Sequence, residues 1–154
     1  MSIVLEQKLL DLLVDEETVK ILATIDQNGA PHAVPKQSLQ VDEDGRLIYL
    51  ELLESSQTNK NMIASLWFNR PIAVALKGKD GASYQIKGRP QRALVAGPVF
   101  QKYYVRIREI LGDVDLAAVW VIDPEQVINQ NFPVRKKQEE TQRPIFLHLD
   151  RLAK

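Results

Sequence analysis

The stretch KILATI at residues 20–25 opens the series of apolar segments that decides the fold, and AVPKQSLQV (33–41), RLIYL (46–50) and IAVAL (72–76) follow it. Short apolar runs of this kind, bounded by turn residues, predict β-strands. Asn28-Gly29 separates the first two segments, and Asp44-Gly45 separates the second from the third. Both dipeptides favour two-residue hairpin turns, so we expect the neighbouring strands to pair antiparallel.

The rest of the chain adds strands and helices around these hairpins. Further strands are expected at 82–95 and 116–122, with a short continuation at 127–128, and helices at 5–13, at 58–68 and from 97 to 111. Gly88-Arg89-Pro90 predicts a bulge where a strand bends. The pattern predicts a mainly β (α+β) chain that forms a six-stranded antiparallel split β-barrel with Greek-key connections and flanking helices. The length of 154 residues predicts a single domain, residues 1–154.

The second predicted strand, at 33–41, contains a proline, and the C-terminal tail is mostly polar. Pro35 lies inside the segment 33–41, and because proline cannot donate to a ladder, we expect an edge or a bulge there. The tail from Pro133 is polar until the apolar patch Ile145-Phe146-Leu147, and no helix or strand is assigned to it.

Composition excludes several classes of function. Twenty basic and twenty acidic residues cancel, which argues against nucleic acid or an anionic membrane as the main partner. The chain has no cysteine, so thiol catalysis, disulfides and thiolate metal sites are excluded, and no metal site is expected. Charged residues interrupt the apolar N-terminal stretch, so we expect neither a signal peptide nor a membrane span there, and a cytoplasmic protein fits these features.

A hydroxyl-rich loop precedes the second predicted helix. Residues 54–61 read ESSQTNKN, with Ser55, Ser56 and Thr58 at the helix start. These residues make a good helix N-cap, which is a purely structural role. The same arrangement leaves N–H groups of the first turn pointing outward, where they can bind a phosphate. The two roles can coexist, and the loop is our first candidate for a binding site.

The order of these features resembles the FMN-binding split-barrel superfamily, to which pyridoxamine 5′-phosphate oxidase belongs. The resemblance covers about residues 19–100 and rests on several short motifs in the right order: LAT at 22–24, NGAPH at 28–32, DGRLIY at 44–49, SQTNKN at 56–61, NRPIAV at 69–74 and YQIKG at 84–88. The family implies a homodimer that binds FMN between its two barrels. It also implies an FMN-dependent oxidoreductase or electron-transfer protein with an unknown small-molecule electron donor or acceptor.

The resemblance implies three groups of FMN-binding residues. Residues of strand two would line the isoalloxazine ring: Val34, Pro35, Lys36, Gln37 and Ser38. The helix-start loop would hold the phosphate: Ser55, Ser56, Gln57 and Thr58, together with Asn61. Two residues of the predicted strand at 82–95 would reach the flavin from the side: Ser83 and Gln85. No catalytic residue is assigned, and the short chain without a basic cluster near its C-terminal end argues against pyridoxamine phosphate oxidation itself.

Gln57 departs from the family pattern, because many relatives have Lys or Arg at this position. This departure keeps two alternatives open, namely a binding or sensory barrel that holds haem, a deazaflavin or pyridoxal phosphate, and a dimerisation module without a cofactor. Lys36 is either an edge-strand lysine that limits aggregation or a cation near the flavin. His32 follows a tight turn, and we expect it to be a surface residue rather than a catalyst.

Overall fold

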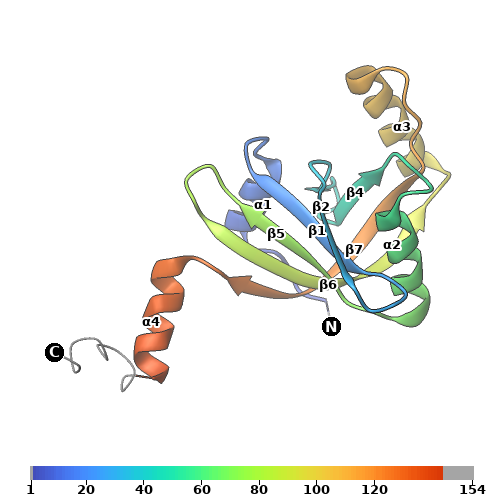
Figure 1. Ribbon diagram of the computed structural model, residues 1–154. Helices are drawn as coiled ribbons and strands as arrows, with labels where there is room; N and C mark the ends of the chain where they lie inside the picture. Colours follow the sequence, from blue (N-terminus) through green and yellow to red (C-terminus); the bar gives the residue numbers. More distant parts are fainter. Residues whose placement is uncertain (1, 144–154) are drawn as a thin grey trace.

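The structure is a computed structural model that describes residues 2–143. One antiparallel sheet of seven strands, in the order β2-β1-β5-β6-β7-β4-β3, curls into a half-open barrel (Figure 1). The strands are β1 (Val19–Ile25), β2 (Pro31–Pro35), β3 (Gln40–Val41), β4 (Leu47–Glu51), β5 (Ile72–Lys77), β6 (Ser83–Leu94) and β7 (Ala118–Asn129). The helices are α1 (Gln7–Val14), α2 (Gln57–Phe68), α3 (Pro98–Leu111) and α4 (Phe132–Gln142). The predicted split barrel with flanking helices is confirmed.

The number of strands differs from the prediction, because the segment 33–41 forms two strands instead of one. β2 ends at Pro35, and a turn follows in which the Leu39 N–H donates to the Lys36 carbonyl at 3.0 Å. After this turn β2 and β3 lie at opposite edges of the sheet, where β2 pairs with β1 and β3 pairs with β4. The lack of an N–H at Pro35 explains why the ladder stops there.

The longest strands, β6 and β7, form the middle of the curled sheet. Their register shifts between Lys87 and Gly88 and again between Pro90 and Arg92, which confirms the predicted irregularity. At the first shift the two backbones approach so closely that a Cβ on Gly88 would overlap the carbonyl oxygen of Asp123. β7 continues without a break to Asn129, whereas the sequence predicted a strand that ends at residue 122 and a separate short piece.

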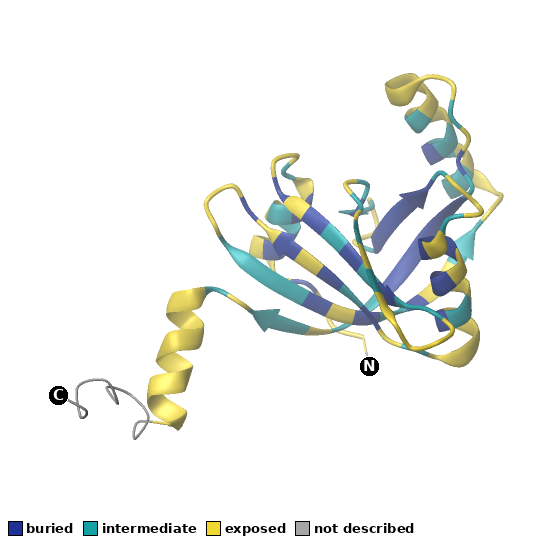
Figure 2. Cartoon of the chain, in the orientation of Figure 1, coloured by how far each residue is buried: buried dark blue, intermediate teal, exposed yellow. Residues whose placement is uncertain are grey.

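The core has two parts, which lie on the two faces of the sheet. The larger part fills the barrel, where Leu9 and Leu13 of α1 pack with Tyr49 and Trp120 of the sheet. The smaller part lies under α3 and joins Tyr103 to residues of β4 and β7 that point away from the barrel interior. Strand β4 and the first five residues of β7 therefore carry buried side chains on both faces, and these stretches are dark blue in Figure 2.

The helix α4 was not predicted from the polar tail. It stands apart from the barrel, and none of its residues is buried (Figure 2). Its few apolar residues lie near its start, so it lacks the apolar stripe that identifies most helices in a sequence. The apolar patch at 145–147 lies outside the described residues. Among residues 2–143, no helix combines the length and the hydropathy that a membrane span requires.

Candidate functional site

A cavity of about 460 Å³ lies between the end of β2, the end of β4 and the helix α3. Its lining residues are Pro35, Lys36, Gln37, Ser38, Leu50, Glu51, Leu52, Leu53, Ile107, Ile110 and Leu111. Four of the five residues predicted to line a flavin ring therefore meet in one cavity. The fifth, Val34, pairs with Leu22 on β1 and is not part of the lining. A volume of this size is within the usual range for small-molecule sites.

The polar end of the cavity is formed by one ion pair. The Lys36 ammonium lies 3.6 Å from the Glu51 carboxylate and 5.8 Å from the centre of the Tyr49 ring. Glu51 is 1% exposed, whereas the Lys36 side chain keeps 20% of its surface accessible. The Tyr49 hydroxyl donates to Glu51 at 3.4 Å, and burial together with the neighbouring carboxylate raises the pKa of Tyr49. Tyr49 consequently remains a protonated donor to Glu51.

Gln37 and Ser38 use their side chains to hold the strands together. The Gln37 amide accepts from the Lys20 N–H at 3.1 Å and donates to the Thr18 carbonyl at 3.0 Å. The Ser38 hydroxyl accepts from the Leu50 N–H at 3.0 Å and donates to the Leu50 carbonyl at 3.2 Å. These bonds form the cavity wall from the end of β2. Lys36 is the lining residue of this segment that carries a charge, and its ammonium group is held by Glu51.

The predicted phosphate loop follows directly after the cavity residues of β4. Ser56 is the N-cap of α2, and its hydroxyl accepts from the Asn59 N–H at 3.0 Å. The same hydroxyl donates to the Glu51 carboxylate at 2.9 Å, and the Leu53 N–H donates to Glu51 at 3.2 Å. Glu51 therefore links the cavity to the start of α2.

Other polar residues of α2 point into the protein. Thr58 and Asn61 are both buried, and the Asn61 amide donates to the Thr24 hydroxyl at 3.0 Å. The Gln57 amide donates to Asn61 at 2.7 Å, while Ser55 is exposed. The Thr58 hydroxyl lies 3.2 Å from Nε2 of His32. His32 is thus a half-buried partner of α2, and the expectation of a surface turn residue was wrong.

Ser83 and Gln85 lie elsewhere in the sheet. The Ser83 N–H donates to the Asn131 side chain at 2.9 Å, which places it beside the start of α4. Gln85 pairs with Ala75 of β5 and Ile128 of β7. In Figure 1, α4 lies at the opposite end of the sheet from α2 and α3. Within one chain, Ser83 and Gln85 of β6 are therefore not brought to the cavity.

Several residues of the site were missed in the sequence. Glu51 interrupts the apolar run from Leu47 to Leu53, and an acid in that position is a signal that could have been noticed. Ile107, Ile110 and Leu111 were assigned to a packing helix and not to a binding wall. Asn59 was also missed, although its side chain accepts from the Trp120 indole at 2.9 Å and donates to the Glu54 carbonyl at 2.9 Å.

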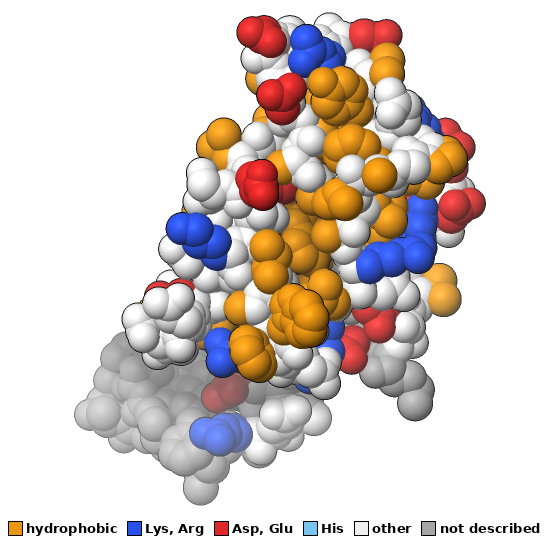
Figure 3. Space-filling view, turned by 90° about the vertical axis from the view of Figure 1, so that its right-hand side faces the viewer, with side chains coloured by type: hydrophobic (Ala, Val, Ile, Leu, Met, Phe, Trp, Pro, Cys, Tyr) orange, Lys and Arg blue, Asp and Glu red, His pale blue; other side chains and the backbone are white. Residues whose placement is uncertain are grey.

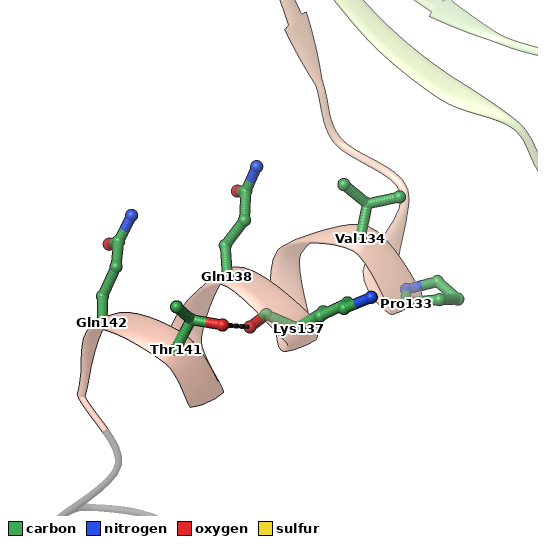
Figure 4. Close-up of a pocket in the computed structure, with 6 residues that line it drawn as sticks. All are labelled: Pro133, Val134, Lys137, Gln138, Thr141 and Gln142. Carbon is green, nitrogen blue, oxygen red and sulfur yellow. Dashed lines mark hydrogen bonds between the residues drawn. The ribbon is translucent and has the colours of Figure 1, made fainter.

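A second hollow, of about 540 Å³, lies along α4 (Figure 4). Its lining residues are Pro133, Val134, Lys137, Gln138, Thr141 and Gln142. All of them come from one exposed helix, and the dashed line in Figure 4 is a bond within that helix, from the Thr141 hydroxyl to the Lys137 carbonyl. A surface formed by one helix holds no converging polar groups from other elements, so we do not assign a site to it.

The cavity between β2, β4 and α3 fits the ring of a flavin better than it fits the phosphate. Apolar side chains of α3 and the β4 end provide a wall for a flat ring, and Lys36 supplies one cation at its edge. At the start of α2, the Ser56, Gln57, Thr58 and Asn61 side chains already have partners within the chain. A phosphate there would rely on backbone N–H groups, on Ser55 and on the helix dipole.

Comparison with known proteins supports the fold. No family model and no curated protein matches the sequence. Solved structures do match, among them HupZ from Group A Streptococcus, with 22% identity over 83% of this chain and 95% of that chain and a TM-score of 0.67. An FMN-binding protein from Syntrophomonas wolfei has 14% identity over 82% of this chain and 88% of its own, with a TM-score of 0.66.

The cofactors of the matching structures differ. A protein assigned as a pyridoxamine 5′-phosphate oxidase from Lactobacillus delbrueckii matches at 18% identity over 80% of this chain and 93% of that chain, with a TM-score of 0.61. HutZ, the heme storage protein from Vibrio cholerae, and an F420 reductase match with a TM-score of 0.57 each, at 12% and 14% identity. These likenesses concern the fold. The chain has the split-barrel fold found in FMN-binding and pyridoxamine 5′-phosphate oxidase-like proteins.

Proposed function

We propose that this chain is a flavoprotein that binds FMN, with the isoalloxazine ring in the cavity between β2, β4 and α3 and the phosphate near the start of α2. One observation carries the proposal: Pro35, Lys36, Gln37 and Ser38, which the family resemblance assigns to the ring, line one cavity next to the predicted phosphate loop. The fold shared with an FMN-binding protein supports it.

In this proposal the chain provides orientation, polarity and exclusion of water, and the flavin when bound supplies redox chemistry, that is, electron or hydride transfer. Ile107, Ile110 and Leu111 exclude water from one side of the ring. The Lys36 ammonium stabilises negative charge at the ring edge, and Glu51 keeps the ammonium in place at 3.6 Å. We therefore propose an FMN-dependent oxidoreductase or electron-transfer protein with a small-molecule donor or acceptor.

The spectrum of the purified protein tests this function. We expect the protein, as isolated or after incubation with FMN, to show the two absorption bands of a flavin and to release FMN on denaturation. A Soret band would instead identify a haem protein, the alternative suggested by the shared fold of the heme storage protein HutZ. A colourless protein that leaves the fluorescence of added FMN unchanged would contradict the proposal.

We also propose that the protein is a homodimer. Figure 3 shows hydrophobic side chains gathered in a band along the face that carries α2 and α3. Exposed apolar residues of α2 and α3 include Trp67, Phe68, Ile110 and Leu111, and Leu53 is exposed in the loop before α2. A large apolar band on a monomer commonly marks an interface, and this one reaches the rim of the cavity. A second copy that covers the band would also close the site.

The variant Ile110→Asp tests the dimer. Ile110 is 69% exposed, so a charge there leaves the folded monomer intact but introduces an unpaired carboxylate into an apolar interface. We expect light scattering to give a dimer mass for the unchanged protein and a monomer mass for the variant. Phe132→Asp is the matched control, because Phe132 is 73% exposed but lies on α4, away from the band. A monomer mass for the unchanged protein, or a dimer in both variants, would refute the proposed interface.

A further inference from the structure

Glu51 is a buried acid in a position where a phosphorylated ligand would need positive charge. It is 1% exposed and lines the cavity. It is the last residue of β4, and α2 begins at Gln57 after a short loop. Four groups of the same chain surround its carboxylate: the hydroxyls of Ser56 and Tyr49, the Leu53 N–H and the Lys36 ammonium. These are the kinds of donor that a bound phosphate uses.

The Ser56 hydroxyl shows how the carboxylate competes with a phosphate. A serine hydroxyl has one proton to donate, and here it goes to Glu51 at 2.9 Å. A phosphate that accepted a bond from Ser56 would have to replace Glu51 as the acceptor of that bond and would lie close to its negative charge. Lys36 has the same limitation, because its charge is compensated by Glu51 at 3.6 Å. Lys36 and Glu51 are the charged residues among the described residues that line the cavity, and their opposite charges cancel.

We propose that Glu51 is a specificity-determining residue of the flavin site, because its carboxylate acts as a built-in anion that takes the donors a phosphate would use. This inference rests on the proposed function. The unchanged protein then obtains its affinity mainly from the isoalloxazine ring, and it binds riboflavin nearly as well as FMN. Removal of the charge on Glu51 ends its repulsion of the phosphate, leaves the Lys36 charge uncompensated and weakens the bond from Ser56, because a neutral oxygen accepts less strongly than a carboxylate.

The test compares two flavins that differ only by the phosphate. Dissociation constants for FMN and riboflavin are measured by quenching of flavin fluorescence, with the cofactor-free protein and with the variant Glu51→Gln. We expect the two constants of the unchanged protein to lie within about threefold of each other. In Glu51→Gln, we expect the ratio of FMN affinity to riboflavin affinity to rise about tenfold, because the variant removes a negative charge that repels the phosphate at a partly buried site, whereas any effect on the ring is common to both flavins.

Glu54→Gln is the matched control. Glu54 is an exposed acid three residues after Glu51 along the chain. Glu54→Gln therefore removes the same charge as Glu51→Gln, but from a position that solvent screens. We expect its ratio of FMN to riboflavin affinity to equal that of the unchanged protein. An equal increase of this ratio in Glu51→Gln and Glu54→Gln would show a general charge effect and would overturn the assignment of Glu51. Circular dichroism establishes that each variant is folded.

The remaining outcomes separate the inference from the proposed function. If the unchanged protein already prefers FMN by a hundredfold, Glu51 is no barrier to phosphate and the inference is overturned, whatever the folding of the variant. If both flavins bind and Glu51→Gln leaves their ratio unchanged, the inference alone fails. If neither flavin binds to the unchanged protein or to Glu51→Gln, the proposed function fails and the inference fails with it.

Discussion

Gly88→Ala is expected to destabilise the protein by about 3 kcal/mol or more, which is the range for changes that force the backbone of a buried strand to move. The added Cβ would overlap the Asp123 carbonyl oxygen and lie 3.1 Å from the carbonyl carbon of Asp123 and from the Pro124 Cα. All three atoms belong to the backbone of β7, so no side chain can rotate away to make room. The β6–β7 pair must separate at the bend that lets the sheet curl.

The measurement is the free energy of unfolding in urea, followed by circular dichroism. Gly81→Ala is the matched control, because Gly81 lies in an open turn at φ +91° with no atom near its missing Cβ. Backbone strain alone costs about 1 kcal/mol there. A loss for Gly88→Ala no larger than that of Gly81→Ala would show that the two strands do not approach each other as described.

Trp120→Ala is expected to cost about 3–5 kcal/mol, the usual range for removal of a large buried aromatic residue. Trp120 is 1% exposed and lies in the barrel core between α2 and the sheet. Its indole N–H also donates to Asn59, and the substitution leaves this buried amide without its donor. Because Asn59 lies in the first turn of α2, we expect weaker FMN binding as well as lower stability.

The chain contains two tryptophans, and the other one provides the control for Trp120. Trp67 is 79% exposed in the single chain, so in the monomeric Ile110→Asp background Trp67→Ala should change the free energy of unfolding by no more than about 0.5 kcal/mol. This variant retains Trp120 as its single tryptophan, and the tryptophan emission should be that of a buried indole that shifts to longer wavelength on unfolding. Similar losses of stability in the two variants would contradict the assigned positions of the two rings.

Local sequence signals predicted most of the elements correctly. The Asn28-Gly29 and Asp44-Gly45 turns lie where they were expected, with Gly29 and Gly45 at positive φ, and Asn69 ends α2 in the left-handed conformation. The prediction of two-residue loops was wrong, because the Asp26 N–H donates to the Ala30 carbonyl and the Asp42 N–H to the Arg46 carbonyl. Each hairpin therefore has a three-residue loop in which glycine alone has a positive φ. Where the prediction was wrong, the local signal was weak or ambiguous. The segment 33–41 was predicted as one strand although Lys36, Gln37 and Ser38 interrupt its apolar residues, and it forms two strands on opposite edges of the sheet. The helix α4 has no apolar face and could not be recognised by periodicity.

The candidate site was less accessible to sequence reasoning than the fold. The family resemblance pointed to residues 34–38 and to the loop 55–58, and these two groups do lie next to each other in the structure. Glu51, which connects them, has no motif of its own. The hydroxyls of Ser56 and Thr58 could be listed from the sequence, but the direction in which each one donates could not.

The sequence by itself determined the hairpins, the helix caps and the apolar segments, because each depends on residues a few positions apart along the chain. The tertiary structure alone decided that Lys36, Glu51 and Ile107 share a cavity, since the curl of the sheet brings together elements that are distant in sequence. It also decided that the Ser56 hydroxyl donates to the buried Glu51 carboxylate while the Thr58 hydroxyl contacts His32. A polar group bonds to whichever partner packing places within reach, and sequence spacing does not specify that partner.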